Sequence, residues 1–207
     1  MPSIDQYSLA AILIEMLFDR LKLGVGTAFI WRADDVHWLI TTWRNVSGRD
    51  QNTGQHLSPT AAEPDRLKVL FNAKASLGDK LAKYVNVRSD AGAPLWLVHP
   101  THGQKVDVVA VPLRNYDDID MYAINTLPSD DLVIQVGMDV FVLGFPFGIA
   151  TAGFPIWKRG SIASEPQLAL PPHPHLLIDT ASRPEMSGSP VIRRTWGYGH
   201  WQHCCWF

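Results

Sequence analysis

Residues 182–192, SRPEMSGSPVI, place Ser187 in a sequence that is typical of a tight turn leading into a strand. Gly188 lets another backbone approach closely, and Pro190 ends the turn before a β-branched pair. A serine held in this way can attack a carbonyl carbon when a base takes its proton and N–H groups stabilise the oxyanion. A Ser-Gly-Ser-Pro turn is also common on protein surfaces. The rest of the sequence is therefore needed to distinguish a catalytic serine from an ordinary surface turn.

The elements that must position Ser187 are predicted to be β-strands. The run GTAFIWRADDVHWLITTW contains two strand-like segments around a polar turn at residues 32–35, which indicates a hairpin. Further short apolar runs, separated by Gly, Pro, Asn or Asp, occur at 67–75, 93–100, 106–113, 132–148, 155–164, 175–181 and 190–194. Residues 8–20 fit either an amphipathic helix or the approach to a strand. Many short strands without βαβ alternation predict an all-β barrel or sandwich.

Four segments resemble the trypsin-like, chymotrypsin-fold serine peptidases, specifically their compact bacterial type. GVGTAFIW (24–31) is similar to the strand before the family's histidine, and WLITTWRNVSG (38–48) is similar to the histidine segment. VDVVAVPL (106–113) resembles the segment with the catalytic aspartate, and residues 140–192 resemble the second half of the fold up to the nucleophile. The resemblance implies two antiparallel β-barrels with the catalytic cleft between them.

The resemblance also implies roles for individual residues. Ser187 takes the place of the nucleophile and Asp107 that of the acid that orients the base. The oxyanion hole is expected at Glu185, Ser187 and Gly188, with the N–H groups of the first two as donors. Because Asp107 lies in an otherwise apolar run, we expect it to be buried and partnered.

The substrate pocket is also implied by the resemblance. Ala181, six residues before the nucleophile, is expected at the base of this pocket, beside Ser182. An uncharged base argues against a preference for Lys or Arg side chains there and favours apolar ones.

Two catalytic positions depart from the family pattern. Arg44 stands at the histidine position, and a guanidinium keeps its proton at physiological pH, so it cannot act as the base. In a comparable triad, loss of the histidine lowers k_cat about a million-fold. Glu185 stands at the oxyanion-loop glycine position, where a Cβ restricts the backbone and a carboxylate repels the oxyanion. We expect Arg44 to form an ion pair with Asp107 or Glu185, because an unpaired charge in the cleft is costly.

Other histidines are weaker candidates for the base. His37 is seven residues before Arg44, about 23 Å along an extended strand, whereas His99 and His102 lie in a loop close to Asp107. For His56, His173 and His175 we favour solvated loop side chains without a catalytic role. The tail HWQHCC brings His200, His203, Cys204 and Cys205 to spacings that a metal could use, but it matches no standard zinc pattern, so no metal site is predicted.

The chain is predicted to divide into an N-terminal extension (1–20), a first β-barrel (21–115) with Arg44 and Asp107, and a second β-barrel (116–207) with Ser187. Only twenty residues follow Ser187, and the aromatic tail among them does not resemble the family's remaining strands. We therefore expect the second barrel to be incomplete at the C-terminus, from truncation or a frame shift, with an open strand edge.

Composition excludes several classes of protein. The formal net charge is −2 and no Lys/Arg-rich run occurs, which argues against a nucleic-acid partner. The two cysteines are adjacent, so a disulfide framework is excluded and a reducing compartment is favoured. The N-terminal apolar run carries acidic residues and is too short to span a bilayer, and no signal peptide is recognised, so a cytoplasmic protein without a membrane partner is expected.

The sequence therefore predicts a homologue of the trypsin-like serine endopeptidases that is itself inactive because the general base is missing. A pseudopeptidase that binds peptides or proteins, and a weakly active hydrolase that uses another base, are the alternatives. The expected partner is a peptide or protein, no cofactor is expected, and the oligomeric state is left open.

Overall fold

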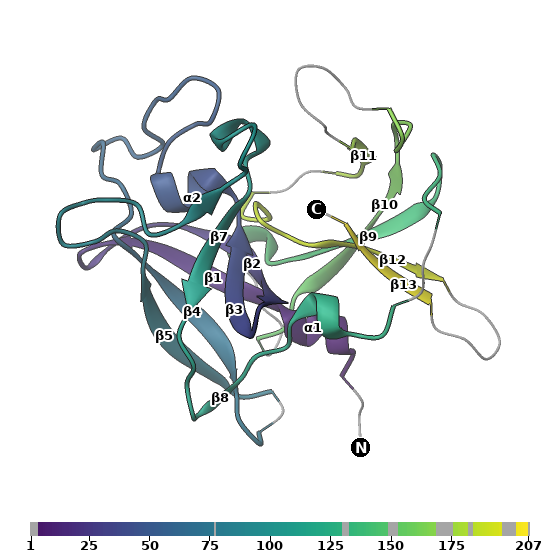
Figure 1. Ribbon diagram of the computed structural model, residues 1–207, viewed down its shortest axis with the longest axis horizontal. Coiled ribbons are helices and arrows are strands. Elements are labelled where there is room, and N and C mark those ends of the chain that lie inside the picture. The colour runs from purple at the N-terminus through teal and green to yellow at the C-terminus, as the bar shows by residue number, and fades with distance from the viewer. Residues whose placement is uncertain are drawn as a thin grey trace.

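The computed structural model describes residues 4–76, 78–129, 133–148, 153–168, 176–181, 184–195 and 202–206, without the side chains of 195 and 202–206. In these residues the strands form two sheets, one of eight strands and one of five. Every pairing between neighbouring strands is antiparallel. Figure 1 shows the first sheet in purple to teal and the second in green to yellow. The predicted all-β class with two antiparallel halves is confirmed.

The first sheet has the strand order β5-β4-β1-β2-β3-β7-β6, and β8 pairs with β4. Its strands are β1 (Ala11–Phe18), β2 (Leu21–Ala33), β3 (Val36–Thr41), β4 (Arg66–Ala73), β5 (Lys80–Asn86), β6 (Leu97–Val98), β7 (Val109–Leu113) and β8 (Ile119–Asp120). Short helices accompany the sheets: α1 (Gln6–Ala10), α2 (Trp43–Ser47), η1 (Gln104–Val106), η2 (Ile124–Thr126) and η3 (Pro146–Gly148). No helix in the described part of the chain has the length and apolar character needed to cross a membrane.

The predicted hairpin is formed by β2 and β3. Ala33 pairs with Val36, so the turn has two central residues, Asp34 and Asp35. Both aspartates have positive φ, 49° and 62°, as the right-handed twist of a two-residue hairpin turn requires. The position of this turn in the sequence is therefore confirmed.

The undecided segment 8–20 contains the end of a helix and then a strand. Asp5 caps α1 by accepting the N–H of Tyr7 at 2.9 Å, and β1 follows at once. β1 lies between β2 and β4, in the middle of the first sheet. Residues from the predicted N-terminal extension thus supply a central strand, while the division into domains stays a prediction.

The second sheet contains β9 (Asp139–Gly144), β10 (Ile156–Ile162), β11 (Ile178–Asp179), β12 (Val191–Thr195) and β13 (Gln202–Trp206), in the order β11-β10-β9-β12-β13. The aromatic tail supplies one further strand, because β13 pairs with all five residues of β12, so this edge of β12 is not open; whether the second barrel is complete stays a prediction. The edge of β12 offers backbone N–H and C=O groups that need partners, and the tail supplies them.

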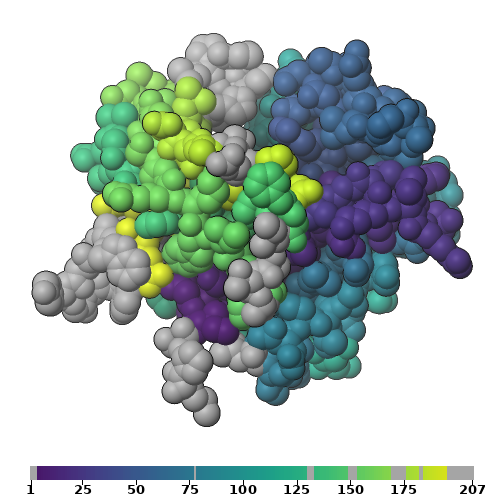
Figure 2. Space-filling model, turned by 180° about the vertical axis from the view of Figure 1, so that it is seen from behind, coloured from purple at the N-terminus to yellow at the C-terminus, as the bar shows by residue number. Residues whose placement is uncertain are grey.

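Two clusters of buried apolar side chains stabilise the fold. The first lies within the first sheet, around Ile14, Leu39, Val69 and Phe71. The second cluster joins the two sheets: Tyr7, Ala10, Ala11, Phe29, Ile124, Leu143 and Ile192. Figure 2 shows the purple N-terminal strands lying directly against the green and yellow second half of the chain. The loop before β12 is therefore held against β2, which positions Ser187.

Candidate active site

Thr27 on β2 anchors the loop that carries Ser187. Its N–H donates to the carbonyl of Ser187 at 2.9 Å, and its Oγ1 donates to the carbonyl of Glu185 at 3.3 Å. Thr27 is completely buried, and its own carbonyl accepts a hydrogen bond from Thr41 Oγ1 at 2.8 Å. The loop is thus fixed to the first sheet by buried hydrogen bonds, which are costly to break.

Every carbonyl of residues 184–187 in this loop has a hydrogen-bond donor. The carbonyls of residues 184–187 all accept hydrogen bonds, from Phe147 N–H, Thr27 Oγ1, Ser189 N–H and Thr27 N–H in turn. In a planar trans peptide the following N–H points away from the carbonyl, so each N–H group of residues 185–188 points away from the donor to the preceding carbonyl. No described residue accepts a hydrogen bond from them. The N–H groups of Glu185 and Ser187 are therefore available to an oxyanion or another acceptor.

Two loop residues have left-handed backbone conformations. Gly188 has φ 89°, and a Cβ added there would lie 2.1 Å from the carbonyl oxygen of Thr27 and 2.5 Å from Thr41 Oγ1. Only glycine fits this close approach. Glu185 has φ 71°, although a side chain makes that conformation unfavourable by about 1–2 kcal/mol.

Arg44 and Asp107 form a close ion pair. Arg44 lies on α2, and its Nε and Nη2 donate to Asp107 Oδ2 at 2.9 and 2.7 Å, while its backbone N–H donates to Oδ1 at 3.2 Å. The Asp107 side chain is 15% exposed and the Arg44 side chain 38%. The expected ion pair of Arg44 is confirmed, and its partner is Asp107.

Asn45, the neighbour of Arg44 on α2, contacts the Ser187 loop. Its Nδ2 donates to Thr41 Oγ1 at 2.9 Å and to the carbonyl of Ser187 at 3.1 Å, and its side chain is buried. Asn45 and Ser187, which are far apart in the sequence, are thus in contact, and Arg44 precedes Asn45 on α2. The hydroxyl of Ser187 forms no hydrogen bond with another described residue.

The arrangement lacks a proton acceptor at the position next to Asp107, because a guanidinium has donors only. His99 Nδ1 already accepts the N–H groups of Thr101 and His102 at 3.2 and 3.1 Å. His37 lies near the start of β3, at the opposite end of that strand from α2. Burial, and secondly the charge of Arg32, lower the pKa of His37. The roles assigned to Ser187, Asp107 and the oxyanion hole stay predictions.

Other predicted site residues are not brought together by the described structure. Ala181 is exposed, and its predicted neighbour in the pocket, Ser182, lies outside the described residues. Of the possible zinc ligands in the tail, His200 lies outside the described residues, and His203, Cys204 and Cys205 are described only as backbone in β13. Within the part that the structure describes, no group of three His, Cys, Asp or Glu side chains could hold a metal ion.

Three residues that position the Ser187 loop were not predicted from the sequence: Thr27, Thr41 and Asn45. All three are buried polar side chains, exposed by 3% or less. Thr27 and Thr41 interrupt apolar strand runs that we had already singled out, and Asn45 follows Arg44 directly. A polar residue within a buried strand needs a partner, which is the signal that could have identified them.

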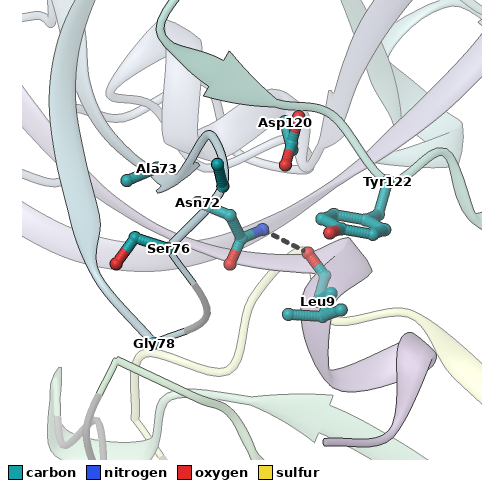
Figure 3. Close-up of a pocket in the computed structure, with 8 residues that line it drawn as sticks. Leu9, Asn72, Ala73, Ser76, Gly78, Asp120 and Tyr122 are labelled. Atoms are coloured by element: carbon teal, nitrogen blue, oxygen red, sulfur yellow. Dashed lines mark hydrogen bonds between the residues drawn. The ribbon is translucent and has the colours of Figure 1, made fainter.

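A cavity of about 190 Å³ lies between β4, β8 and α1. Figure 3 shows Asn72 at its centre, with its Nδ2 directed at the carbonyl of Leu9, to which it donates at 2.9 Å. Lys80 Nζ donates to Asn72 Oδ1 at 2.5 Å and lies 4.8 Å from the centre of the Phe154 ring. No carboxylate in the described residues pairs with Lys80, and burial lowers the pKa of its amine to about 8.

This lysine predicts a stability that rises at alkaline pH. The pKa of Lys80 is about 8 in the folded chain and near 10.5 in the unfolded one, so the unfolded state binds more protons between these values and the free energy of unfolding increases with pH. We expect a gain of about 1–2 kcal/mol after solvent screening. Urea unfolding at several pH values from 7.5 to about 10 should show this rise relative to Lys80→Met. Parallel curves for the two proteins would contradict it.

Comparisons with known proteins agree with this architecture. No family model and no curated protein matches the sequence. Among solved structures the chain is similar to the serine endoprotease from Yersinia pestis, with a TM-score of 0.55 and 12% identity over 93% of this chain and 54% of that one. It is also similar to the MamO protease domain from Magnetospirillum magneticum, with a TM-score of 0.51 and 16% identity over 97% of this chain and 92% of that one.

At these low sequence identities, the structural similarity shows a shared fold and does not show a shared function. The chain has the chymotrypsin-like fold of serine protease domains, so the predicted fold class is confirmed. It spans only about half the length (54%) of the Yersinia pestis protein.

Proposed function

We propose that this chain keeps the fold of a serine endopeptidase without its hydrolytic chemistry, and that it binds peptides or proteins. The observation that carries the proposal is the Arg44–Asp107 ion pair, which involves the residue that precedes Asn45, the α2 residue in contact with the Ser187 loop. In the trypsin-like peptidases that the chain resembles, the aspartate at the position of Asp107 orients a base that takes the proton of the nucleophilic serine. Here the Asp107 carboxylate is committed to a permanent cation that cannot take that proton.

Three features support binding in place of catalysis. The loop carbonyls of residues 184–187 all accept hydrogen bonds, and no described residue accepts one from the N–H groups of residues 185–188, which leaves these donors for a peptide carbonyl. The buried bonds of Thr27 and Asn45 keep this loop rigid, and rigidity reduces the entropy lost on binding. Glu185, at the glycine position, adds a negative charge beside the hole, which opposes a tetrahedral oxyanion more than a neutral carbonyl.

The loss of hydrolysis is tested with a fluorophosphonate probe, whose phosphorus is attacked by an activated serine hydroxyl as fluoride leaves. We expect no labelling of Ser187 above that of the Ser187→Ala variant, because no base is placed to accept the proton. Labelling of Ser187 in the unchanged chain would contradict the proposal and favour the alternative, a weakly active hydrolase with another base.

Binding is tested separately, with a fluorescent unfolded protein such as labelled casein. Its anisotropy should rise on addition of the chain, with no fragments on a gel. Ser187→Tyr places a ring in the cleft and should weaken binding, whereas Ser129→Tyr, at an exposed position away from the site, should not. Equal binding by both variants would place the ligand elsewhere and contradict the proposal.

A further inference from the structure

A cavity of about 410 Å³ lies next to Glu185, on the side of the Ser187 loop that faces β1, β2 and η3. Its walls are mainly apolar or lack a side chain: Leu13, Leu23, Gly24, Val25, Phe147 and Gly148. Three charged side chains also line it, Glu15, Lys22 and Glu185. Its volume is in the range of small-molecule pockets, about 300–1,000 Å³.

The charges in this cavity are unevenly paired. Glu15 accepts hydrogen bonds from Lys22 at 2.9 Å and from Lys68 at 3.0 Å. Burial raises the pKa of Glu15, but the two lysines outweigh burial and lower it overall. Glu15 therefore already has two cations, and Lys22 is engaged by it.

Among the described residues, no cation pairs with Glu185. Its Oε2 is buried, and no described residue donates a hydrogen bond to it. The atom lies against Gly148, 3.4 Å from the position that a Cβ there would take, and Val25 borders the same position. A buried carboxylate oxygen without a described donor is unfavourable, and Glu185 lines the cavity, so a cation there gains a strong, charge-assisted hydrogen bond once the carboxylate turns toward it.

We propose that this cavity binds a basic side chain, an alkyl ammonium or guanidinium group, through Glu185. The leucine, valine and phenylalanine walls fit the methylene stem of a lysine or arginine, which buries readily while its head stays polar. The inference rests on the proposed function in one respect: since Glu185 belongs to the Ser187 loop, the basic side chain is that of the bound peptide. An anionic ligand is disfavoured because it would face Glu185 while Lys22 is paired.

The test compares N-acetyl-lysine methylamide with N-acetyl-norleucine methylamide, which has a stem of similar length without the charge. Titration followed by NMR of the intact chain at low salt should show about tenfold tighter binding of the lysine compound. Glu185→Gln should abolish this preference and leave the norleucine compound unaffected. Asp35→Asn, at an exposed carboxylate that also has positive φ, is the matched control and should keep the preference.

A second measurement does not depend on the variants. The preference for the lysine compound should shrink as salt is added, because an ion pair at a partly open cavity is screened. Equal affinity for the two compounds, no loss in Glu185→Gln, or tighter binding of N-acetyl-glutamate methylamide would each overturn the proposal.

The small compounds also separate this inference from the proposed function. They need only the cavity, not the whole cleft. If they bind as expected but unfolded protein does not, the peptide-binding function fails and the cavity stands. If unfolded protein binds and the lysine preference is absent, the cavity proposal fails and the function stands.

Discussion

The Arg44→His/Glu185→Gly double variant is expected to react with a fluorophosphonate at Ser187 at least about a thousand-fold faster than the unchanged chain. An imidazole at position 44 accepts the serine proton, and the Asp107 carboxylate, 15% exposed, is already held at the start of α2 to receive its other N–H. Removal of the Glu185 carboxylate lets the loop N–H groups stabilise negative charge. Labelling rates measured by mass spectrometry check the result.

The single variants separate the two contributions. Arg44→His alone should recover part of the rate, because the base returns while the carboxylate still opposes the oxyanion. Glu185→Gly alone should recover none, because no group accepts the proton. Ser187→Ala in the double variant should remove all labelling. A double variant as silent as the unchanged chain would mean that more than these two positions separates the site from a peptidase.

Much of the fold could be predicted from local patterns. The β2–β3 hairpin was predicted because apolar runs flank a polar turn, and its two aspartates accept positive φ better than most residues do. β5 was not predicted, because it is an edge strand on which only Val85 is buried, so its sequence carries little apolar alternation. The strand in the tail was missed because its pairing depends on the edge of β12, which local sequence does not show.

The site was predictable in its positions but not in its contacts. The resemblance implied that Arg44, Asp107 and Ser187 share a cleft, and the described contacts of Arg44 and Asn45 are compatible with it. The choice of Asp107 over Glu185 as the partner of Arg44 could not be predicted. It depends on where the loop that carries Glu185 is held, and the long-range hydrogen bonds of this loop with Thr27 are not visible in the local sequence.

Gly188→Ala is expected to lower the free energy of unfolding by at least about 3 kcal/mol. The added Cβ would lie 2.1 Å from the Thr27 carbonyl oxygen, which belongs to a central strand and cannot move aside without disturbing the pairing of β2. The loop would have to retreat, and the hydrogen bonds that hold the Ser187 carbonyl to Thr27 and Asn45 would lengthen or break. Urea unfolding of the two proteins measures the difference.

Gly54→Ala is the matched control, because Gly54 also has positive φ, 70°, but no atom lies within 4 Å of its added Cβ. It should cost only about 1 kcal/mol, the penalty of a left-handed alanine. The difference between the two variants therefore isolates the contact with Thr27 from the backbone conformation. Equal losses would mean that the loop can move away from β2 freely, and then neither the rigid binding face nor the fixed orientation of the loop N–H groups could be maintained.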